Sequence, residues 1–114
     1  MAIIVKTSDP AGLLARIKKA IAETHVETWE VDSDGDFTHT PAQFVRNAWL
    51  HPAVLDSELR FYILRNKNIK GTRAIYAIYH GRFIEMLLTH FFKSFEVVWP
   101  SRDPMDNDNY TFDA

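Results

Sequence analysis

The stretch "AIYAIYHGRFIEMLLTHFF", residues Ala74–Phe92, changes its hydrophobic pattern in the middle. Before His80 the apolar residues alternate, as in a strand, and after Gly81 they recur every three or four residues, as in a helix. The pattern therefore predicts a strand over Thr72–Tyr79 that leads into a helix over about residues 81–93. The apolar stripe expected for this helix consists of Ile84, Leu87, Leu88 and Phe91, widened by Phe83.

The chain before this stretch predicts one further long helix and several short strands. Asp9 can accept a hydrogen bond from free helix amides, and Pro10 fits the first helical position, so a helix is expected over about residues 10–23. Asp34-Gly35 is typical of a hairpin turn. Strands are expected at Ile3–Val5, 26–31, 37–39, 49–54, Leu59–Leu64 and Phe95–Trp99, with a helical turn or two near Pro41–Asn47.

This order of elements predicts an α+β fold: a single-domain, two-layer sandwich with a mainly antiparallel sheet and two principal helices, at about residues 10–23 and 81–93. The strand Leu59–Leu64 is apolar on both faces, and we expect it at the centre of the sheet, joined as a hairpin to Thr72–Tyr79. Residues 1–100 should form the domain, and residues 101–114 an acidic, partly ordered tail into which Tyr110 and Phe112 could dock.

Composition limits the classes of function. The 114 residues include no cysteine, which excludes a disulfide scaffold, a thiolate metal site and a cysteine nucleophile. No segment has the roughly 18 consecutive apolar residues of a membrane span, and no signal peptide is recognisable, so we expect no membrane partner and a cytoplasmic location. The net charge of −2 argues against coating by nucleic acid but leaves room for a local basic patch.

The best catalytic candidates lie at the predicted junction: His80, Arg82 and Glu85. Free backbone amides and the positive end of the helix dipole would meet there and favour an anion. The alternative is that Glu85 only pairs with Arg82, three residues before it on the same helix, in a weak surface contact. A small enzyme or anion-binding protein centred on His80 and Arg82 is therefore one hypothesis.

The sequence predicts no metal site and no cofactor. The histidines (His25, His39, His51, His80 and His90) show no spacing that places two imidazoles on one helical turn, although a site built from several elements, such as His39 with His51, stays open. The acidic stretch Glu30–Thr38 spaces its oxygens like a calcium loop, but position twelve is Pro41, where a glutamate is needed. A hairpin turn explains the same residues.

A basic segment, Arg65–Arg73, offers a second hypothesis. It carries four cations, Arg65, Lys67, Lys70 and Arg73, and no acidic residue. Such a loop can follow the phosphates of a nucleic acid. A solvated loop, with charge answered by the acidic tail, is the alternative that we favour.

The leading hypothesis is a non-enzymatic binding or protein-interaction module that associates with itself. Three tryptophans and eight phenylalanines exceed what one small core needs, so a partner is expected to cover the excess. A homodimer that buries a sheet face or the last helix would do this, and another protein is a further possibility.

Overall fold

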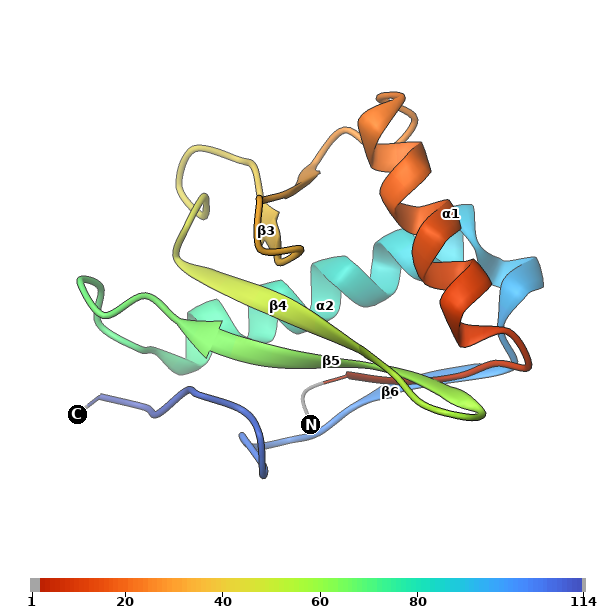
Figure 1. Cartoon of the computed structure of the whole chain (residues 1–114). Coiled ribbons are helices and arrows are strands. Elements are labelled where there is room, and N and C mark those ends of the chain that lie inside the picture. The colour runs from red at the N-terminus through yellow and green to blue at the C-terminus, as the bar shows by residue number, and fades with distance from the viewer. Residues whose placement is uncertain (1–2, 114) are drawn as a thin grey trace.

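The computed structural model describes residues 3–113, which form a six-stranded antiparallel sheet with two helices (Figure 1). This confirms the predicted α+β sandwich. The strands lie in the order β2-β3-β4-β5-β1-β6. Their bounds are β1 Ile3–Lys6, β2 Trp29–Val31, β3 Phe37–His39, β4 Ala48–Val54, β5 Glu58–Arg65 and β6 Val97–Pro100. The helices are α1 Pro10–Ala22 and α2 Arg73–His90, followed by the 3-10 turn η1 Phe92–Ser94.

One face of the sheet is buried, and both helices pack on it. Along β5, Leu59, Phe61 and Ile63 are fully buried, whereas the residues between them are half-buried. This alternation is typical of a sheet covered on one face. The core residues that the helices add include Leu13 and Ile17 of α1 and Tyr79, Phe83 and Leu87 of α2.

Helix α1 begins as the sequence predicts. The Asp9 carboxylate accepts a hydrogen bond of 3.1 Å from the Gly12 amide, and Pro10 is the first helical residue. An N-terminal cap of this kind stabilises a helix by about 1 kcal/mol.

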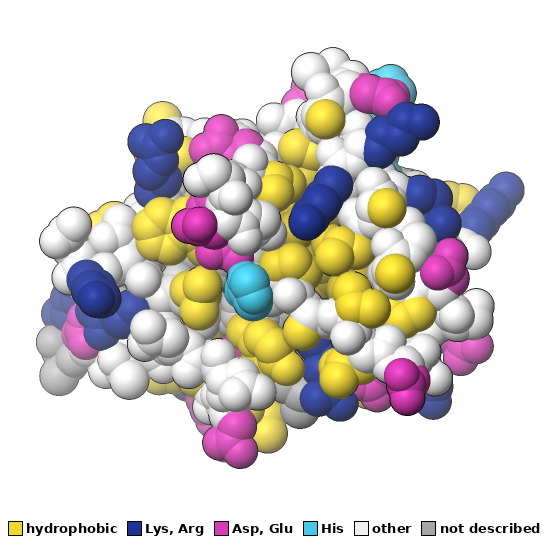
Figure 2. Space-filling model, viewed as in Figure 1, with side chains coloured by type: hydrophobic (Ala, Val, Ile, Leu, Met, Phe, Trp, Pro, Cys, Tyr) yellow, Lys and Arg dark blue, Asp and Glu magenta, His cyan; other side chains and the backbone are white. Residues whose placement is uncertain are grey.

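The strands on the β2 side also follow the prediction. Trp29 pairs with His39 across the hairpin, and Gly35 adopts the positive φ of 83° that the turn requires. Strand β3 pairs with β4 only at Phe37 and Leu50, so Pro52 lies where no neighbour needs its amide. Hydrophobic side chains are visible on the surface between β4 and α1 (Figure 2).

Residues 41–47 contain a single helical turn and no longer helix, so the expected helical turn is present in its shortest form. The Phe44 and Val45 amides both donate to the Pro41 carbonyl, and the Thr40 hydroxyl donates to the Glu27 carbonyl instead of capping a helix. Arg46, with φ of 57°, then breaks any helical path.

The largest correction concerns Ala74–Phe92. The predicted strand Thr72–Tyr79 and its hairpin with β5 are wrong, because α2 runs without a break from Arg73 to His90. Thr72 caps the helix: its hydroxyl oxygen accepts a hydrogen bond of 3.1 Å from the Ile75 amide. The predicted change of structure at Gly81 therefore does not occur.

The buried stripe of α2 also differs from the predicted one. Leu88 is 53% exposed, and Ile84 is only partly buried. The buried residues are Tyr76, Tyr79, His80, Phe83, Met86 and Leu87, which recur every three or four residues across Gly81.

The tail docks on the domain. Asn109 lies beside Leu64 in a parallel bridge, with the Arg65 amide donating to the Asn109 carbonyl at 2.7 Å. Tyr110 is buried, and its hydroxyl donates to the Thr72 carbonyl at 2.8 Å. The docking of Tyr110 and Phe112 that the sequence suggested is thus present, since both rings contact Tyr76.

Candidate functional site

His39, the last residue of β3, is the centre of the best candidate site. Its side chain is 1% exposed. The Nδ1 atom donates a hydrogen bond of 2.7 Å to the Thr28 carbonyl, which leaves Nε2 as the atom that can accept. Within residues 3–113, Nε2 has no hydrogen-bond partner. A buried polar atom without a partner is costly, so it is a reason to look for a ligand.

Aromatic rings hold the His39 imidazole in place. Its centroid lies 4.5 Å from that of Trp29, and Phe44 and Tyr79 pack against it from other directions. Burial lowers the pKa of His39, and this effect exceeds the opposing one of the hydrogen bond to Thr28. The ring is therefore neutral near pH 7, with Nε2 as a hydrogen-bond acceptor.

The ring lines a cleft of about 310 Å³ between α2 and the segment that precedes β2. Polar and titratable side chains dominate its wall. The lining residues are His25, Val26, Glu27, Thr28, His39, Arg82, Glu85, Met86, Thr89 and His90. Such a volume is at the lower end of that of small-ligand sites.

Arg82 and Glu85, two of the three predicted catalytic candidates, line this cleft together. Both act on His39 through their charges: Arg82 lowers the pKa of the imidazole, and Glu85 raises it. Among the ion pairs of the described residues there is none between Arg82 and Glu85. The predicted surface pair is thus not formed, and both charges are available to a ligand.

The third candidate, His80, lies elsewhere. It lines a groove on the opposite flank of α2, and its Nδ1 donates to the Tyr76 carbonyl at 2.6 Å. The expected anion site at free helix amides is wrong, because residues 80–85 are in the interior of α2, where backbone amides bond to carbonyls one turn earlier. The first turn of α2 begins at Arg73 instead.

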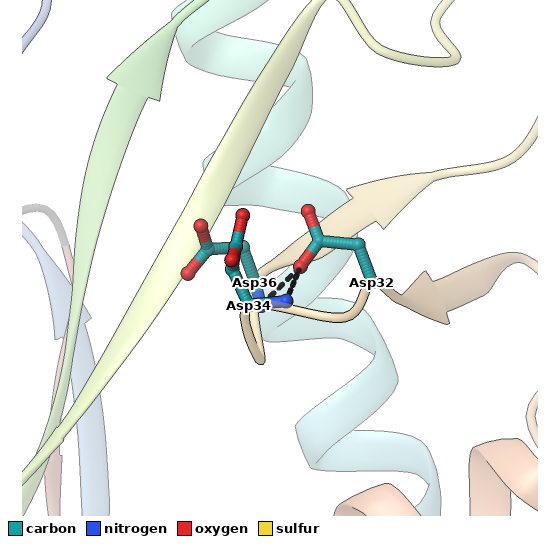
Figure 3. Close-up of side chains that lie close together, drawn as sticks. All are labelled: Asp32, Asp34 and Asp36. Carbon is teal, nitrogen blue, oxygen red and sulfur yellow. Dashed lines mark hydrogen bonds between the residues drawn. The ribbon is translucent and has the colours of Figure 1, made fainter.

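The predicted acidic hairpin forms a compact turn (Figure 3). Asp32 accepts hydrogen bonds of 2.9 Å from the amides of Asp34 and Asp36, and the three carboxylates lie close together. Asp36 also contacts His51. His51 is thereby paired with Asp36, while His39 donates to Thr28, so the predicted combination of His39 with His51 is not supported.

The acidic tail forms ion pairs with two of the four cations of the basic segment. Arg65 forms an ion pair of 2.8 Å with Asp113, and Arg73 pairs with Asp103. Lys67 and Lys70 are exposed. This arrangement fits the favoured interpretation of a solvated loop whose charge is partly offset, and it weakens the case for a nucleic-acid groove.

Sequence reasoning named His39 only as a possible partner of His51 and not as a neighbour of Arg82 and Glu85, because no local spacing marks it. Its neighbours come from two separate parts of the chain, Thr28 before β2 and Arg82 with Glu85 on α2, and only the fold brings them together. The one local signal was its place opposite Trp29 in a predicted hairpin, where a histidine would share an aromatic layer.

Comparison with known proteins adds no assignment: no family model, no curated protein and no solved structure matches the chain. Neither α1 nor α2, nor any other helix within residues 3–113, combines the length and apolar character that crossing a membrane requires.

Proposed function

We propose that the protein is a non-enzymatic binding module that holds a small zwitterion, such as a free α-amino acid, in the cleft at His39. One observation carries the proposal: Arg82 and Glu85, two side chains of opposite charge, line the same cleft as the buried, neutral imidazole of His39.

The charges of the cleft match a ligand that carries both signs. Arg82 suits a carboxylate, which it can bind through two parallel hydrogen bonds. Glu85 suits an ammonium group, since its carboxylate accepts hydrogen bonds. Residues three apart on a helix have Cβ atoms about 5–6 Å apart, which fits opposite charges separated by few bonds.

The wall of the cleft favours binding over covalent chemistry. Its lining residues include no serine and no cysteine. The threonines, Thr28 and Thr89, have no described hydrogen bond to an imidazole that would activate a hydroxyl.

Calorimetric titration with a panel of free α-amino acids tests this proposal. At least one should bind saturably, whereas the matched carboxylate and amine, each lacking the other charge, should bind at least tenfold more weakly. Arg82→Gln and Glu85→Gln should each weaken binding about tenfold or more, as expected for a charge-assisted hydrogen bond. The control is Arg16→Gln, an exposed arginine on α1.

Saturable binding that is lost in both cleft variants and kept in the control would support the proposal. If no amino acid of the panel binds at millimolar concentration, or if the cleft variants bind as the natural chain does, the proposal is wrong.

Self-association is a second candidate function, favoured by the helix-free face of the sheet. The side chains on this face follow from the register, in which Ile4 lies between Arg60 and Trp99. Trp99 is 41% exposed. Apolar side chains predominate over the whole face: Ile4, Trp49, Tyr62, Leu64, Val97 and Trp99.

A second copy of the chain is the partner that suits this face. Lys6, Glu58 and Arg60 give it both signs of charge, so a copy related by a twofold axis can oppose unlike charges. Light scattering at micromolar concentration should show a dimer that Trp99→Glu dissociates. Leu88→Glu, at an exposed position on α2, is the control that should leave it intact. A monomer at all concentrations would remove this candidate.

A further inference from the structure

We propose that the outer face of α2 pairs with α2 of a second copy of the chain, with the two helices antiparallel. This face is a line of residues at steps of four, three and four along the helix: Ala77, Gly81, Ile84 and Leu88. Leu88 is 53% exposed, and Phe92, just beyond the helix, is 58% exposed. Large apolar side chains that lie open to solvent close together indicate an interaction surface. The face lies on the helix side of the sheet, so this pairing is distinct from the one at the helix-free face (Figure 1).

The groove beside α2 has the form of a hole for one side chain of a facing helix. Its volume is about 320 Å³, and at Gly81 a Cβ atom would meet nothing within 4 Å. Four of its lining residues have the spacing i, i+3, i+4 and i+7: Ala77, His80, Gly81 and Ile84. In knobs-into-holes packing, four residues of one helix surround each side chain, the knob, that enters from the other helix. The groove is therefore a hole in which a second helix can place an apolar side chain.

The matching knob lies on the same helix. Gly81 and Leu88 are equally far along α2 from a point between Ile84 and Glu85. A twofold axis at this point makes the two helices antiparallel and places Leu88 of each copy over Gly81 of the other. Hole and knob are then both used twice, as an isologous interface requires. This relation between the two positions favours a second copy of the chain as the partner, because an unrelated helix needs only the hole.

The edges of the paired face agree with this arrangement. The same axis sets Phe92 of one copy level with Ala77 of the other, whose small side chain leaves room for a ring. Arg82 and Glu85 are exposed beside the face, so two copies bring two charges of each sign to one edge and no net charge. One helix pair buries less surface than a standard interface, so we expect association only at submillimolar concentrations. At micromolar concentrations Leu88 is then free, and the cleft at His39 stays open to its ligand.

Disulfide cross-linking tests the register of the pair, because the chain has no cysteine of its own. Gly81→Cys and Leu88→Cys, mixed in equal amounts at submillimolar concentration with an oxidant, should form a mixed disulfide. Neither variant should cross-link to itself, because its two copies would be separated by seven residues along the helices, about 10 Å, whereas a disulfide spans at most roughly 7 Å between Cα atoms. Thr89→Cys is the matched control: it is exposed and adjacent to Leu88 but lines the cleft on the other flank. It should cross-link to Gly81→Cys at least tenfold more slowly.

Reversible association gives a second test that needs no cross-link. The Trp99→Glu background removes the dimer proposed at the helix-free face, and sedimentation equilibrium at submillimolar concentrations should then show a dimer formed by α2. Gly81→Leu fills the hole, and Leu88→Glu replaces the knob by a charge, so each should raise the dissociation constant of this dimer at least tenfold. Thr89→Glu, with the same charge on the other flank, should leave it unchanged. All three positions are exposed, so the variants should fold.

The inference is overturned if the mixed disulfide forms no faster than with Thr89→Cys, or if Leu88→Cys cross-links to itself as readily as to Gly81→Cys. It is also overturned if the Trp99→Glu chain stays monomeric at submillimolar concentrations, or if Gly81→Leu and Leu88→Glu associate as Thr89→Glu does. The result does not depend on the functions proposed above, since the Trp99→Glu background lacks the dimer at the helix-free face and no amino acid is added.

Discussion

The cleft at His39 and the groove at His80 place the same chemical group in two different surroundings. Each imidazole is buried, donates its Nδ1 hydrogen to a backbone carbonyl and leaves Nε2 without a partner among residues 3–113. The two cavities also have nearly equal volumes, about 310 and 320 Å³. The residues that line the two cavities differ in charge.

One helix produces both walls. Arg82, Glu85 and Thr89 recur at steps of three and four residues along one flank of α2 and give the cleft its charges. Ala77, Gly81 and Ile84 recur at steps of four and three along the other flank and give the groove its apolar floor. A hydrophobic pattern taken over the whole of α2 combines the two flanks, so neither the charged flank nor the apolar flank is recognisable from it.

The largest expected effect comes from a substitution in the core beneath both sites. Phe83 is fully buried between the flanks and contacts Trp29, Phe37 and Phe61. Phe83→Ala should lower the free energy of unfolding by about 3–5 kcal/mol, because it leaves a cavity under the centre of α2. Urea denaturation measures this loss. A loss below about 1 kcal/mol would show that the two flanks do not share this support.

Lowering the pH should then act on both sites alike. Burial lowers the pKa of His39 and of His80 in the folded chain, so the unfolded chain binds more protons below its own histidine pKa of about 6.5. Stability is full above that pH and falls as the pH drops towards the folded values, by at most about 1.4 kcal/mol per pH unit for each histidine.

Replacement of each histidine separates the two contributions. Urea midpoints between about pH 5 and pH 8 should fall less steeply in His39→Gln and in His80→Phe than in the natural chain. His51→Gln, at a half-exposed imidazole, is the control. Parallel profiles for all four proteins would contradict the view that both buried rings stay neutral.

The smallest expected effect tests the open space beside Gly81 through stability alone. Gly81→Ala should raise the free energy of unfolding by about 0.5–1 kcal/mol, because alanine reduces the entropy cost of a helix interior and its Cβ meets open space. Thermal denaturation measures the gain. The comparison substitution is Gly71→Ala, whose Cβ would come 2.3 Å from the Thr111 carbonyl oxygen and should destabilise the docked tail. A loss of stability in Gly81→Ala would mean that the groove is closed.

The sequence was informative where a local signal and the fold agreed. Asp9 and Pro10 predicted the start of α1, and Asp34-Gly35 predicted the hairpin, because caps and turns depend on a few neighbouring atoms. The α+β class followed from the order of such elements.

The prediction from the sequence was wrong where a strand pattern and a helix pattern overlapped. The β-branched and aromatic residues of Thr72–Tyr79 favour a strand, but Tyr76, Tyr79 and Phe83 form a helical stripe that requires a histidine, His80, on the buried side. A polar residue in that stripe hid its period, and Gly81 was taken as a break. The Thr72 cap was the signal that could have corrected the boundary.

Only part of the candidate site was predicted, because the rest depends on how distant segments pack together. Arg82 and Glu85 were identified together because they lie on one helix, whatever its first residue. His39 required knowledge that β3 lies beside α2, and sequence spacing does not contain strand order. His39 and Arg82 are more than forty residues apart in the chain, and local sequence patterns do not extend over such a separation.

The place of β1 has a consequence for how the chain folds. The first strand, red in Figure 1, lies between β5 and β6, whose residues follow it by more than fifty and more than ninety positions. Its hydrogen bonds on one side therefore wait for the last strand to be synthesised. The β4–β5 hairpin and α1 consist of local contacts and can form first. Strand β6 lies at the edge of the sheet beside β1, so it can join the sheet only after residues 3–6 have paired with β5, and we expect these two long-range pairings to form late in folding.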